Sequence, residues 1–168
     1  SHHLESARLL ADAGVHLLIE KPISHAASGV AELITSCRAR GTVLMTGYNL
    51  RFLPSLRHFQ EQLRGNRIGR LLSVRAEVGQ YLPTWRPDAD YRLGVSARAD
   101  LGGGVLLELS HEIDYLRWIL GEVRWVGAVQ RKQSNLEIDV EDVAHLMLGF
   151  GNPGSQAELV ATLNMDFV

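Results

Sequence analysis

The sequence predicts an α/β fold in its first part and an α+β fold in the rest. The expected architecture is part of a doubly wound parallel sheet, then a mostly antiparallel sheet with a packed helix. Up to about residue 65, short continuous apolar runs alternate with helical segments, which is typical of parallel strands buried on both faces. Beyond about residue 70, apolar residues recur at every second position, which is typical of strands with one solvated face.

The first part reads helix, strand, helix, strand, helix. Gly14 and Gly41 mark the ends of two helices, and Ser24 is a suitable N-cap. Pro22 ends the first strand, because proline cannot continue a central strand. We expect helices over residues 3–13, 25–40 and 54–63, and strands over 16–20 and 42–47. Two strands are too few for a stable sheet, so we expect the rest of the sheet outside this chain or in a partner.

The second part contains strands with one buried face. Leu72, Val74, Ala76 and Val78 share one parity, and the same alternation recurs near the end of the chain. We expect strands over 72–78, 122–133, 144–150 and 157–167, and a single helix over 103–120. The pattern changes near residues 66–70, which divides the chain into domains at 1–67 and 68–168.

Composition limits the classes of function. The formal net charge is −2 and 46% of residues are hydrophobic, so bulk charge attracts neither nucleic acid nor an anionic membrane. A single cysteine, Cys37, forms no internal disulfide, which fits a reducing compartment. With neither a signal peptide nor a long apolar run, a cytoplasmic protein is expected.

Three motifs are candidates for chemistry. Glu20-Lys21-Pro22 follows a parallel strand, at the sheet edge where open α/β sheets bind ligands. Lys21 is one of only two lysines in the chain. The alternative to a ligand-binding role for this tripeptide is a solvated turn. Tyr81–Arg92 is a loop dense in aromatic and Arg side chains, suited to a polar ring or to ordinary packing.

The third motif is Gly102-Gly103-Gly104 followed by the predicted helix. Glu108 and His111 are spaced i,i+3, and His111 and Tyr115 i,i+4, on the face opposite the apolar stripe. A carboxylate beside an imidazole suits a general base near neutral pH; the alternative is an exposed polar face. The glycines allow close approach to a ligand or form a flexible turn. A metal site would need a distant ligand such as His145, so none is expected.

Taken in order, these segments resemble the Gfo/Idh/MocA oxidoreductase family along nearly the whole chain. The resemblance rests on short motifs, each weak alone: His3, Gly14, Leu17–Pro22, Gly47–Phe52, Ile68-Gly69, Trp85-Arg86, the triple glycine, His111–Asp114, and Trp118 before Gly121. It implies a Rossmann-type domain followed by an α/β domain with a large sheet. The implied reaction is hydride transfer between NAD or NADP and a hydroxyl-bearing carbon of a sugar, polyol or sugar nucleotide.

The resemblance also implies residue roles. Lys21 would lie between nicotinamide and substrate, and His111 would exchange the hydroxyl proton, with Glu108 as the third catalytic residue. Cofactor binding would involve Glu20, Lys21, Pro22, Asn49, Arg51, Trp85 and Arg86. Substrate binding would involve Lys21, Tyr91, Arg92 and His111. The resemblance also implies that the protein forms a homo-oligomer, a dimer or a tetramer, through its antiparallel sheet.

Two features depart from the family pattern. The position four residues before His111, often Asp in the family, is Leu107, and the acid is Glu108. No Gly-rich turn of the G-x-G-x-x-G type joins a strand to a helix, so the chain resembles an internal fragment that also lacks the family's final strands. Alternatives to an enzyme are a non-catalytic binding or assembly module and an NAD(P)-linked sensor; the Glu108, His111 and Lys21 set favours the enzyme.

Overall fold

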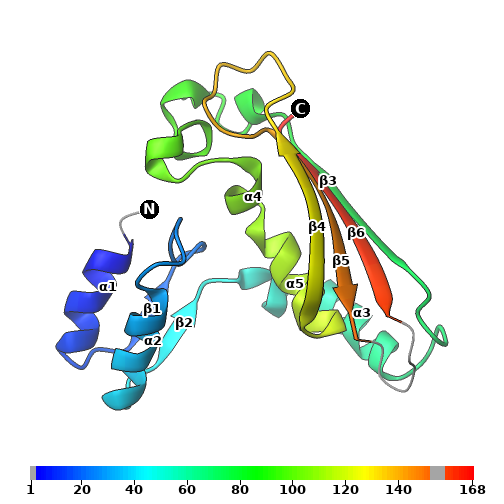
Figure 1. The fold of residues 1–168 in the computed structure, drawn as a ribbon, viewed down its shortest axis with the longest axis horizontal. Helices are drawn as coiled ribbons and strands as arrows, with labels where there is room; N and C mark the ends of the chain where they lie inside the picture. The colour runs from blue at the N-terminus through cyan, green and yellow to red at the C-terminus, as the bar shows by residue number, and fades with distance from the viewer. Residues whose placement is uncertain (1–2, 152–157) are drawn as a thin grey trace. The chain divides into compact units, whose positions relative to one another are not determined.

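The computed structural model describes residues 3–151 and 158–168, which form two compact units (Figure 1). The first unit runs to Tyr48 and the second begins at Asn49. Each unit has its own buried core, so each is described by itself. No helix within the described ranges is long and apolar enough to cross a membrane.

The first unit is a two-stranded parallel sheet with two helices. Its elements are α1 (His3–Asp12), β1 (Leu17–Ile19), α2 (Val30–Ala39) and β2 (Leu44–Thr46), with Leu17 opposite Leu44. Leu17 and Ile19 are buried, whereas Leu18 is 74% exposed. The predicted burial of this strand on both faces is therefore not observed among the described residues, since the helices cover only one side.

Helix α2 begins later than the sequence pattern predicts. Ser24 accepts a hydrogen bond from the Ala26 N–H at 3.2 Å, which forms a short turn rather than a helix start. The N-cap position is Gly29, which adopts a left-handed conformation with φ of 80°, so α2 starts at Val30. Ser24 therefore makes the expected kind of backbone bond in a different structure.

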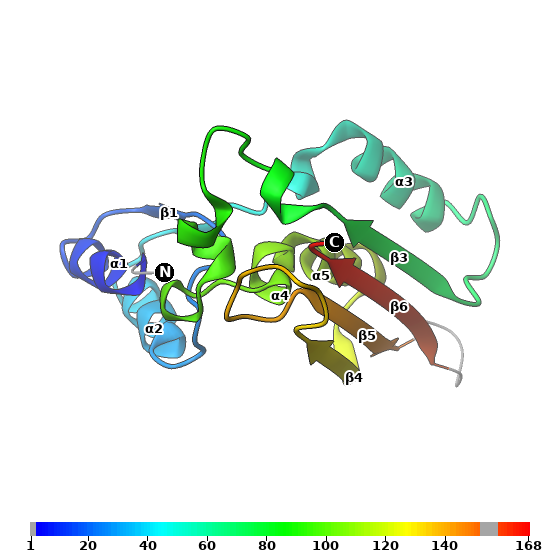
Figure 2. The same ribbon diagram turned by 90° about the horizontal axis from the view of Figure 1, so that it is seen from above.

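The second unit places its helices beside a four-stranded sheet (Figures 1 and 2). The helical elements are η1 (Asn49–Phe52), α3 (Pro54–Arg64), α4 (Val105–Glu108) and α5 (Ser110–Leu120). Short 3-10 turns connect β3 to α4. Helix α3 has its Pro in the first turn, as predicted.

The predicted single helix over 103–120 is wrong. Leu109 has φ of −96° and ψ of 23°, outside helical geometry, and separates α4 from α5. The Leu109 N–H still bonds to the Val105 carbonyl at 2.9 Å, and the Glu112 N–H bonds to the Leu109 carbonyl at 3.0 Å. Apolar periodicity continues through the break, because Leu109 stays buried, so the sequence pattern does not reveal it.

The sheet is mostly antiparallel, as expected, but it contains one parallel pair of strands. Its strands are β3 (Val74–Gly79), β4 (Val123–Arg131), β5 (Val143–Phe150) and β6 (Leu159–Asp166), in the order β3-β6-β5-β4. β5 pairs antiparallel with β4 and β6, but β3 pairs parallel with β6. The alternating pattern of β3 reports burial on one face and not the direction of its neighbour.

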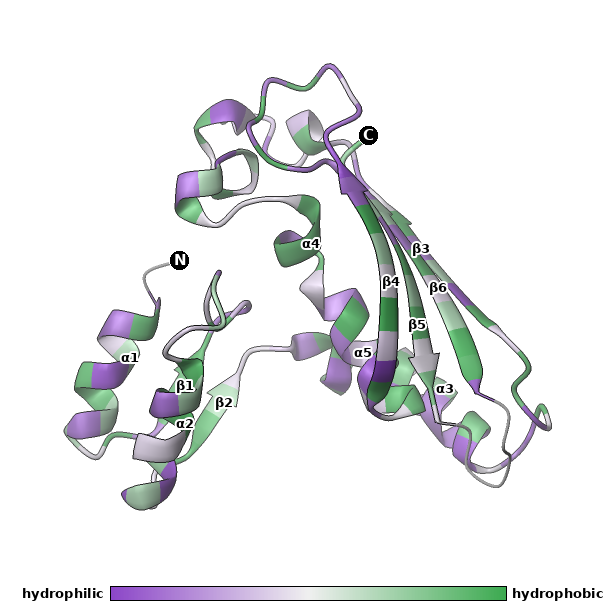
Figure 3. Ribbon diagram, viewed as in Figure 1, coloured by the Kyte–Doolittle hydropathy of each residue, from purple (hydrophilic) through white to green (hydrophobic). Residues whose placement is uncertain are grey.

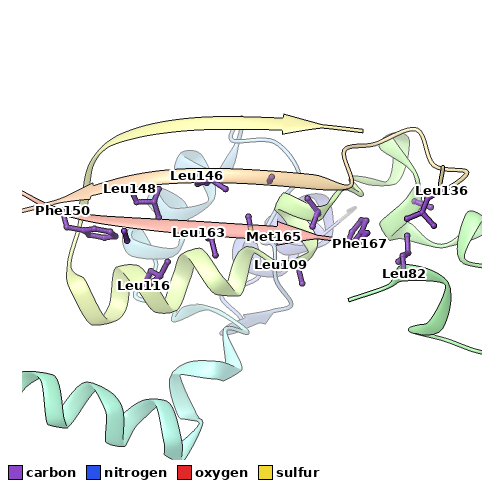
Figure 4. Close-up of a cluster of buried hydrophobic side chains, with 14 of the residues drawn as sticks. Leu82, Leu109, Leu116, Leu136, Leu146, Leu148, Phe150, Leu163, Met165 and Phe167 are labelled. Atoms are coloured by element: carbon purple, nitrogen blue, oxygen red, sulfur yellow. The ribbon is translucent and has the colours of Figure 1, made fainter. Parts of the chain in front are cut away.

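The core of the second unit lies between one face of the sheet and α4 and α5. Leu109 and Leu116 pack against Leu163 and Met165, with Phe150 and Phe167 fully buried (Figure 4). Helix α4 is largely apolar, and polar positions alternate with apolar ones along the strands (Figure 3). Burying each such side chain stabilises the fold by about 1.5–3 kcal/mol.

The compact units differ from the predicted domains 1–67 and 68–168 by η1 and α3. Both elements belong to the second unit. Their side chains bond to α5: Arg51 of η1 pairs with Asp114, and Gln60 of α3 donates to the Trp118 carbonyl. These long-range contacts are invisible to a search for composition changes along the chain.

The loop between β4 and β5 is held by a buried carboxylate. Asp142 is fully buried and accepts hydrogen bonds from the Gln133 N–H at 2.7 Å and the Ser134 N–H at 3.0 Å, as well as from the Ser134 hydroxyl. Burial raises the pKa of Asp142, but these hydrogen bonds outweigh it and hold the pKa below its usual value.

Candidate functional site

The residues after the two parallel strands form one candidate region of the first unit. Glu20, Lys21 and Pro22 follow β1 directly, and Gly47 follows β2. The Gly47 N–H donates to the Ile19 carbonyl at 2.7 Å. A Cβ added to Gly47 would lie 3.5 Å from both carboxylate oxygens of Glu20, so the Glu20 carboxylate lies close to the backbone after β2.

His3 supports the Lys21–Pro22 turn from helix α1. Its Nδ1 lies 3.2 Å from the Pro22 carbonyl oxygen, and the Lys21–Pro22 peptide is cis. Lys21 is partly exposed. The carboxyl edge of parallel strands is where open α/β sheets bind ligands, so the structure places Glu20, Lys21 and Pro22 at the edge that the sequence predicts.

In the second unit, His111 lies in the first turn of α5 beside a buried carboxylate. His111 Nε2 is 3.4 Å from Glu112 Oε1, and Glu112 is only 9% exposed. Tyr115, one turn further along α5, has its pKa raised by burial and by its hydrogen bond with Glu112. Glu112 therefore joins an imidazole and a phenol in one polar cluster.

Glu108 belongs to a different helix from His111. It is the last residue of α4, and the break at Leu109 separates it from α5. The helix that the sequence predicts to carry both Glu108 and His111 is thus interrupted between them, whereas the i,i+4 relation of His111 and Tyr115 lies wholly within α5. A carboxylate that contacts the imidazole, Glu112, is one to which the spacing analysis assigned no role.

Asp114 is a second buried acid on α5. Its carboxylate accepts hydrogen bonds from Arg51 Nε and Nη2, both at 2.7 Å, in the bidentate geometry that suits a guanidinium. The Asp114 side chain is 8% exposed and that of Arg51 41%. Arg51 therefore holds a carboxylate of its own unit, and Asn49, also in η1, is exposed.

A sequence signal for both acids exists in His111-Glu112-Ile113-Asp114. Ile113 belongs to the predicted apolar stripe, and the two acids flank it. An acid that is itself buried on a helix needs a charged or hydrogen-bonding partner. The partner of Asp114 lies 63 residues away in sequence, so the pattern could indicate that a partner exists but not which residue it is.

The triple glycine is packed against the protein itself. Gly102 and Gly104 have φ of 78° and 103°. A Cβ on Gly103 would meet the carbonyls of Val95, Ser96 and Arg98, the last two at 2.8 and 2.9 Å. The close backbone approach expected for a ligand is made here by residues 95–98.

Glu141 completes the turn that begins α4. Its side-chain Oε1 accepts a hydrogen bond from the Leu106 N–H, and its backbone carbonyl accepts one from the Val105 N–H, both at 3.1 Å. A Cβ on Gly104 would collide with the Glu141 carboxylate. The glycines therefore form a tight, specific start to α4 rather than a flexible turn.

The loop after β3 surrounds a small hollow. Trp85, Arg86 and Tyr91 are among the residues that line it. The Trp85 ring packs edge-on against Phe167 with centroids 5.2 Å apart, and its Nε1 donates to the Gln80 carbonyl at 3.0 Å. Trp85 is thus fixed to the core, whereas Arg86 is exposed.

Tyr91 and Arg92 hold this loop to the β4–β5 connection. The Tyr91 hydroxyl accepts a hydrogen bond from the Glu137 N–H at 3.2 Å. Arg92 pairs with Asp90 at 2.8 Å and Glu137 at 3.0 Å, and these partners raise the pKa of the guanidinium. Both predicted substrate-binding residues therefore have structural partners in the loop.

The letters of the dinucleotide-binding pattern occur once, from Gly149 to Gly154. Gly149 lies in β5, and the next element that the structure describes is the strand β6; residues 152–157 lie outside the described ranges. A phosphate-binding loop of this type leads from a strand into a helix. Because residues 152–154 of the pattern lie outside the described ranges, the structure shows only that the pattern begins in a strand.

Comparison with known proteins gives a consistent family. The model of the GFO/IDH/MocA C-terminal domain matches residues 56–167. 1,5-Anhydro-D-fructose reductase of Ensifer adhaerens is 31% identical over 125 residues, 71% of this chain and 35% of that protein. Levoglucosan dehydrogenase of Pseudarthrobacter phenanthrenivorans is 30% identical over 129 residues, 76% of this chain and 32% of that protein.

A solved structure agrees with these sequence relatives. GenD2 from gentamicin A biosynthesis, in complex with NAD, is 26% identical and aligns with a TM-score of 0.83, covering 99% of this chain and 46% of that one. The matched regions of the two curated relatives amount to 35% and 32% of their lengths. The chain therefore spans less than half of each of these three proteins.

Proposed function

Because the chain belongs to the GFO/IDH/MocA family of oxidoreductases, we propose that it is part of an NAD(P)-dependent dehydrogenase. The substrate would be a sugar, polyol or sugar nucleotide, and the reaction hydride transfer at its hydroxyl-bearing carbon. The observation that carries the proposal is the polar cluster at the start of α5, in which His111 contacts the buried carboxylate of Glu112 at 3.4 Å.

The residues at the carboxyl edge of β1 and β2 fit a nicotinamide cofactor. The Glu20 carboxylate lies beside the Gly47 backbone, and a lysine such as Lys21 can donate hydrogen bonds to a hydroxyl group. We propose Glu20, Lys21 and Pro22 as cofactor-binding residues, together with Asn49, Trp85 and Arg86 of the second unit; Arg51, which the family resemblance places with them, is instead paired with Asp114. The bound cofactor would supply the hydride chemistry.

His111 is proposed to accept the hydroxyl proton when the substrate is oxidised and to return it in the reverse direction. A neighbouring carboxylate fixes the tautomer of an imidazole and stabilises its protonated form, and Glu112 has the position to do this. Lys21 would hold the substrate hydroxyl group, and Tyr91 and Arg92 would contact other parts of the substrate. Glu108 remains the proposed third catalytic residue, although the break at Leu109 separates it from the helix that carries His111.

Assembly into a homo-oligomer through the sheet is part of the same proposal. The sheet face away from α5 carries exposed apolar side chains, among them Val129 and Met147. A second copy of this face would cover them.

A titration with NADH tests the cofactor part of the proposal. Energy transfer from Trp85, Trp118 and Trp125 to the bound dihydronicotinamide would report binding. We expect saturable binding that Lys21→Gln weakens, with Lys132→Gln, the chain's other lysine, as the matched control. Equal binding by both variants would contradict the role of Lys21. No binding would mean that cofactor affinity requires a chain that includes a phosphate-binding loop.

A further inference from the structure

We propose that the Arg51–Asp114 ion pair is a positioning device for α5 and thereby for the His111 imidazole. This inference rests on the proposed function, because it concerns the same catalytic helix. It assigns Arg51 a role different from the cofactor contact implied by family resemblance. The device consists of residues from η1, α3 and α5, all within the second unit.

The ion pair is bidentate and partly buried, unlike a typical exposed surface pair. Two parallel hydrogen bonds of 2.7 Å join the guanidinium to the carboxylate, and the Asp114 side chain is 8% exposed. Surface ion pairs contribute little to stability, whereas breaking a buried pair leaves an uncompensated charge. The position of η1 is therefore tied to Asp114.

Asp114 is placed one helical turn after His111. Residues three apart on a helix are neighbours on its surface. A contact that fixes the Asp114 side chain therefore also fixes the helical turn that carries the His111 imidazole. Arg51 comes three positions after Tyr48, the last residue of the first unit. The pair thus fixes the beginning of the second unit's chain to the turn of α5 that bears His111.

A second contact holds the C-terminal end of α5. Gln60 of α3 is 4% exposed, and its Nε2 donates to the Trp118 carbonyl at 2.9 Å. This carbonyl is among the last four of the helix, which have no partner within the helix. Contacts in the middle and near the C-terminal end restrict rotation of α5 about its axis, and catalytic geometry requires positions held to about 0.5 Å.

The alternative roles of Arg51 make different predictions. If the pair only stabilises packing, replacing both residues by apolar ones of similar size restores stability and leaves the imidazole in place. If Arg51 binds the cofactor, its loss weakens NADH binding without affecting His111. If the pair positions α5, the environment of His111 changes even when the fold is retained.

The experiment follows the His111 imidazole by ¹H–¹³C NMR in this chain, with the resonance assigned by its loss in His111→Ala. The variants are Arg51→Lys, which keeps the charge but not the fork, and the double variant Arg51→Met, Asp114→Leu. The matched control is Arg117→Lys, which alters an exposed pair on the same helix, where Nη2 of Arg117 lies 2.6 Å from Glu122. Circular dichroism confirms folding of each.

We expect the His111 resonance to shift in Arg51→Lys and in the double variant, and to stay in place in Arg117→Lys. An unchanged resonance in folded Arg51→Lys would overturn the proposal, as would a wild-type resonance in the double variant. The NMR result does not depend on cofactor binding. A failure of NADH to bind therefore tests the proposed function, whereas a static His111 resonance tests the positioning role.

Discussion

Glu112 illustrates how a single residue acquires a role from its surroundings. It lies in the first turn of α5, where the helix dipole favours a negative charge. Its Oε1 lies 3.4 Å from the His111 imidazole, and the carboxylate is hydrogen-bonded with the Tyr115 side chain. Glu112 therefore joins both polar side chains of α5 that the sequence analysis selected.

Replacing Glu112 tests how its carboxylate affects the His111 imidazole. In Glu112→Gln, we expect the His111 ring resonances to shift, because the imidazole loses a carboxylate whose Oε1 lies 3.4 Å from Nε2. Glu122→Gln is the matched control, since the Glu122 side chain is 80% exposed and pairs with Arg117 instead. ¹H–¹³C NMR of the His111 ring measures both variants. A shift of equal size in Glu122→Gln would contradict the role of Glu112.

Tyr115 provides a pH-dependent prediction. Its pKa is raised by burial and by Glu112, so the folded state binds the phenolic proton more tightly than the unfolded state. This contribution to stability is complete below the unfolded pKa, about 10, and is lost as the pH rises toward the folded pKa. Urea unfolding between pH 9 and 11 should show a steeper loss of stability than in Tyr115→Phe, and equal slopes would contradict the shift.

At the residue scale, sequence reasoning finds residues with distinctive neighbours and misses those defined by distant partners. Lys21 and His111 stand in recognisable motifs, and the structure places them after β1 and on α5. Arg51 and Asp114 carry no local pattern that joins them, because their contact spans 63 residues. The i,i+3 spacing of Glu108 and His111 assumes a continuous helix, whereas the structure has a break at Leu109 between them.

At the scale of elements, periodicity predicts which residues are buried better than where a helix ends. The strands β5 and β6 have the predicted parity, with Leu146, Leu148, Leu163 and Met165 buried. Leu109 stays buried at the break between α4 and α5, so the hydrophobic spacing does not reveal the break. The parallel pairing of β3 with β6 is similarly hidden, since one buried face gives the same alternation in either direction.

The triple glycine at the start of α4 gives an element-scale prediction. Gly103→Ala should destabilise the second unit by about 2–3 kcal/mol, because the new methyl group would meet three backbone carbonyls that cannot move independently. The control is Gly127→Ala, whose methyl group would meet only the flexible end of Met147 at 3.3 Å. Chemical denaturation compares the two, and similar losses would show that residues 95–98 yield easily.

At the scale of the whole molecule, the sheet of the second unit has two different faces. The face toward α5 is buried, and its side chains form the core. The opposite face, here called the open face, carries the alternate residues of β4, β5 and β6: Trp125, Val129, His145, Met147, Thr162 and Asn164. His145 and Asn164 bond to each other across the strands at 2.9 Å, so polar and apolar groups share this surface.

Self-association should bury the apolar part of the open face. Trp125 Nε1 donates to Glu158 at 2.7 Å, and this contact holds the indole in place, while Val129 and Met147 are 52% and 51% exposed. A stable interface buries about 800 Å² on each partner, and buried lysine charges oppose its formation. The double variant Val129→Lys, Met147→Lys should therefore shift the chain toward monomer in sedimentation velocity.

Val126→Lys is the control for this prediction. Val126 is 60% exposed and lies on the same strand as Val129, but its register partner is Leu148, a residue that faces the core. A monomeric parent chain, or equal dissociation by the control, would place any oligomer contact elsewhere.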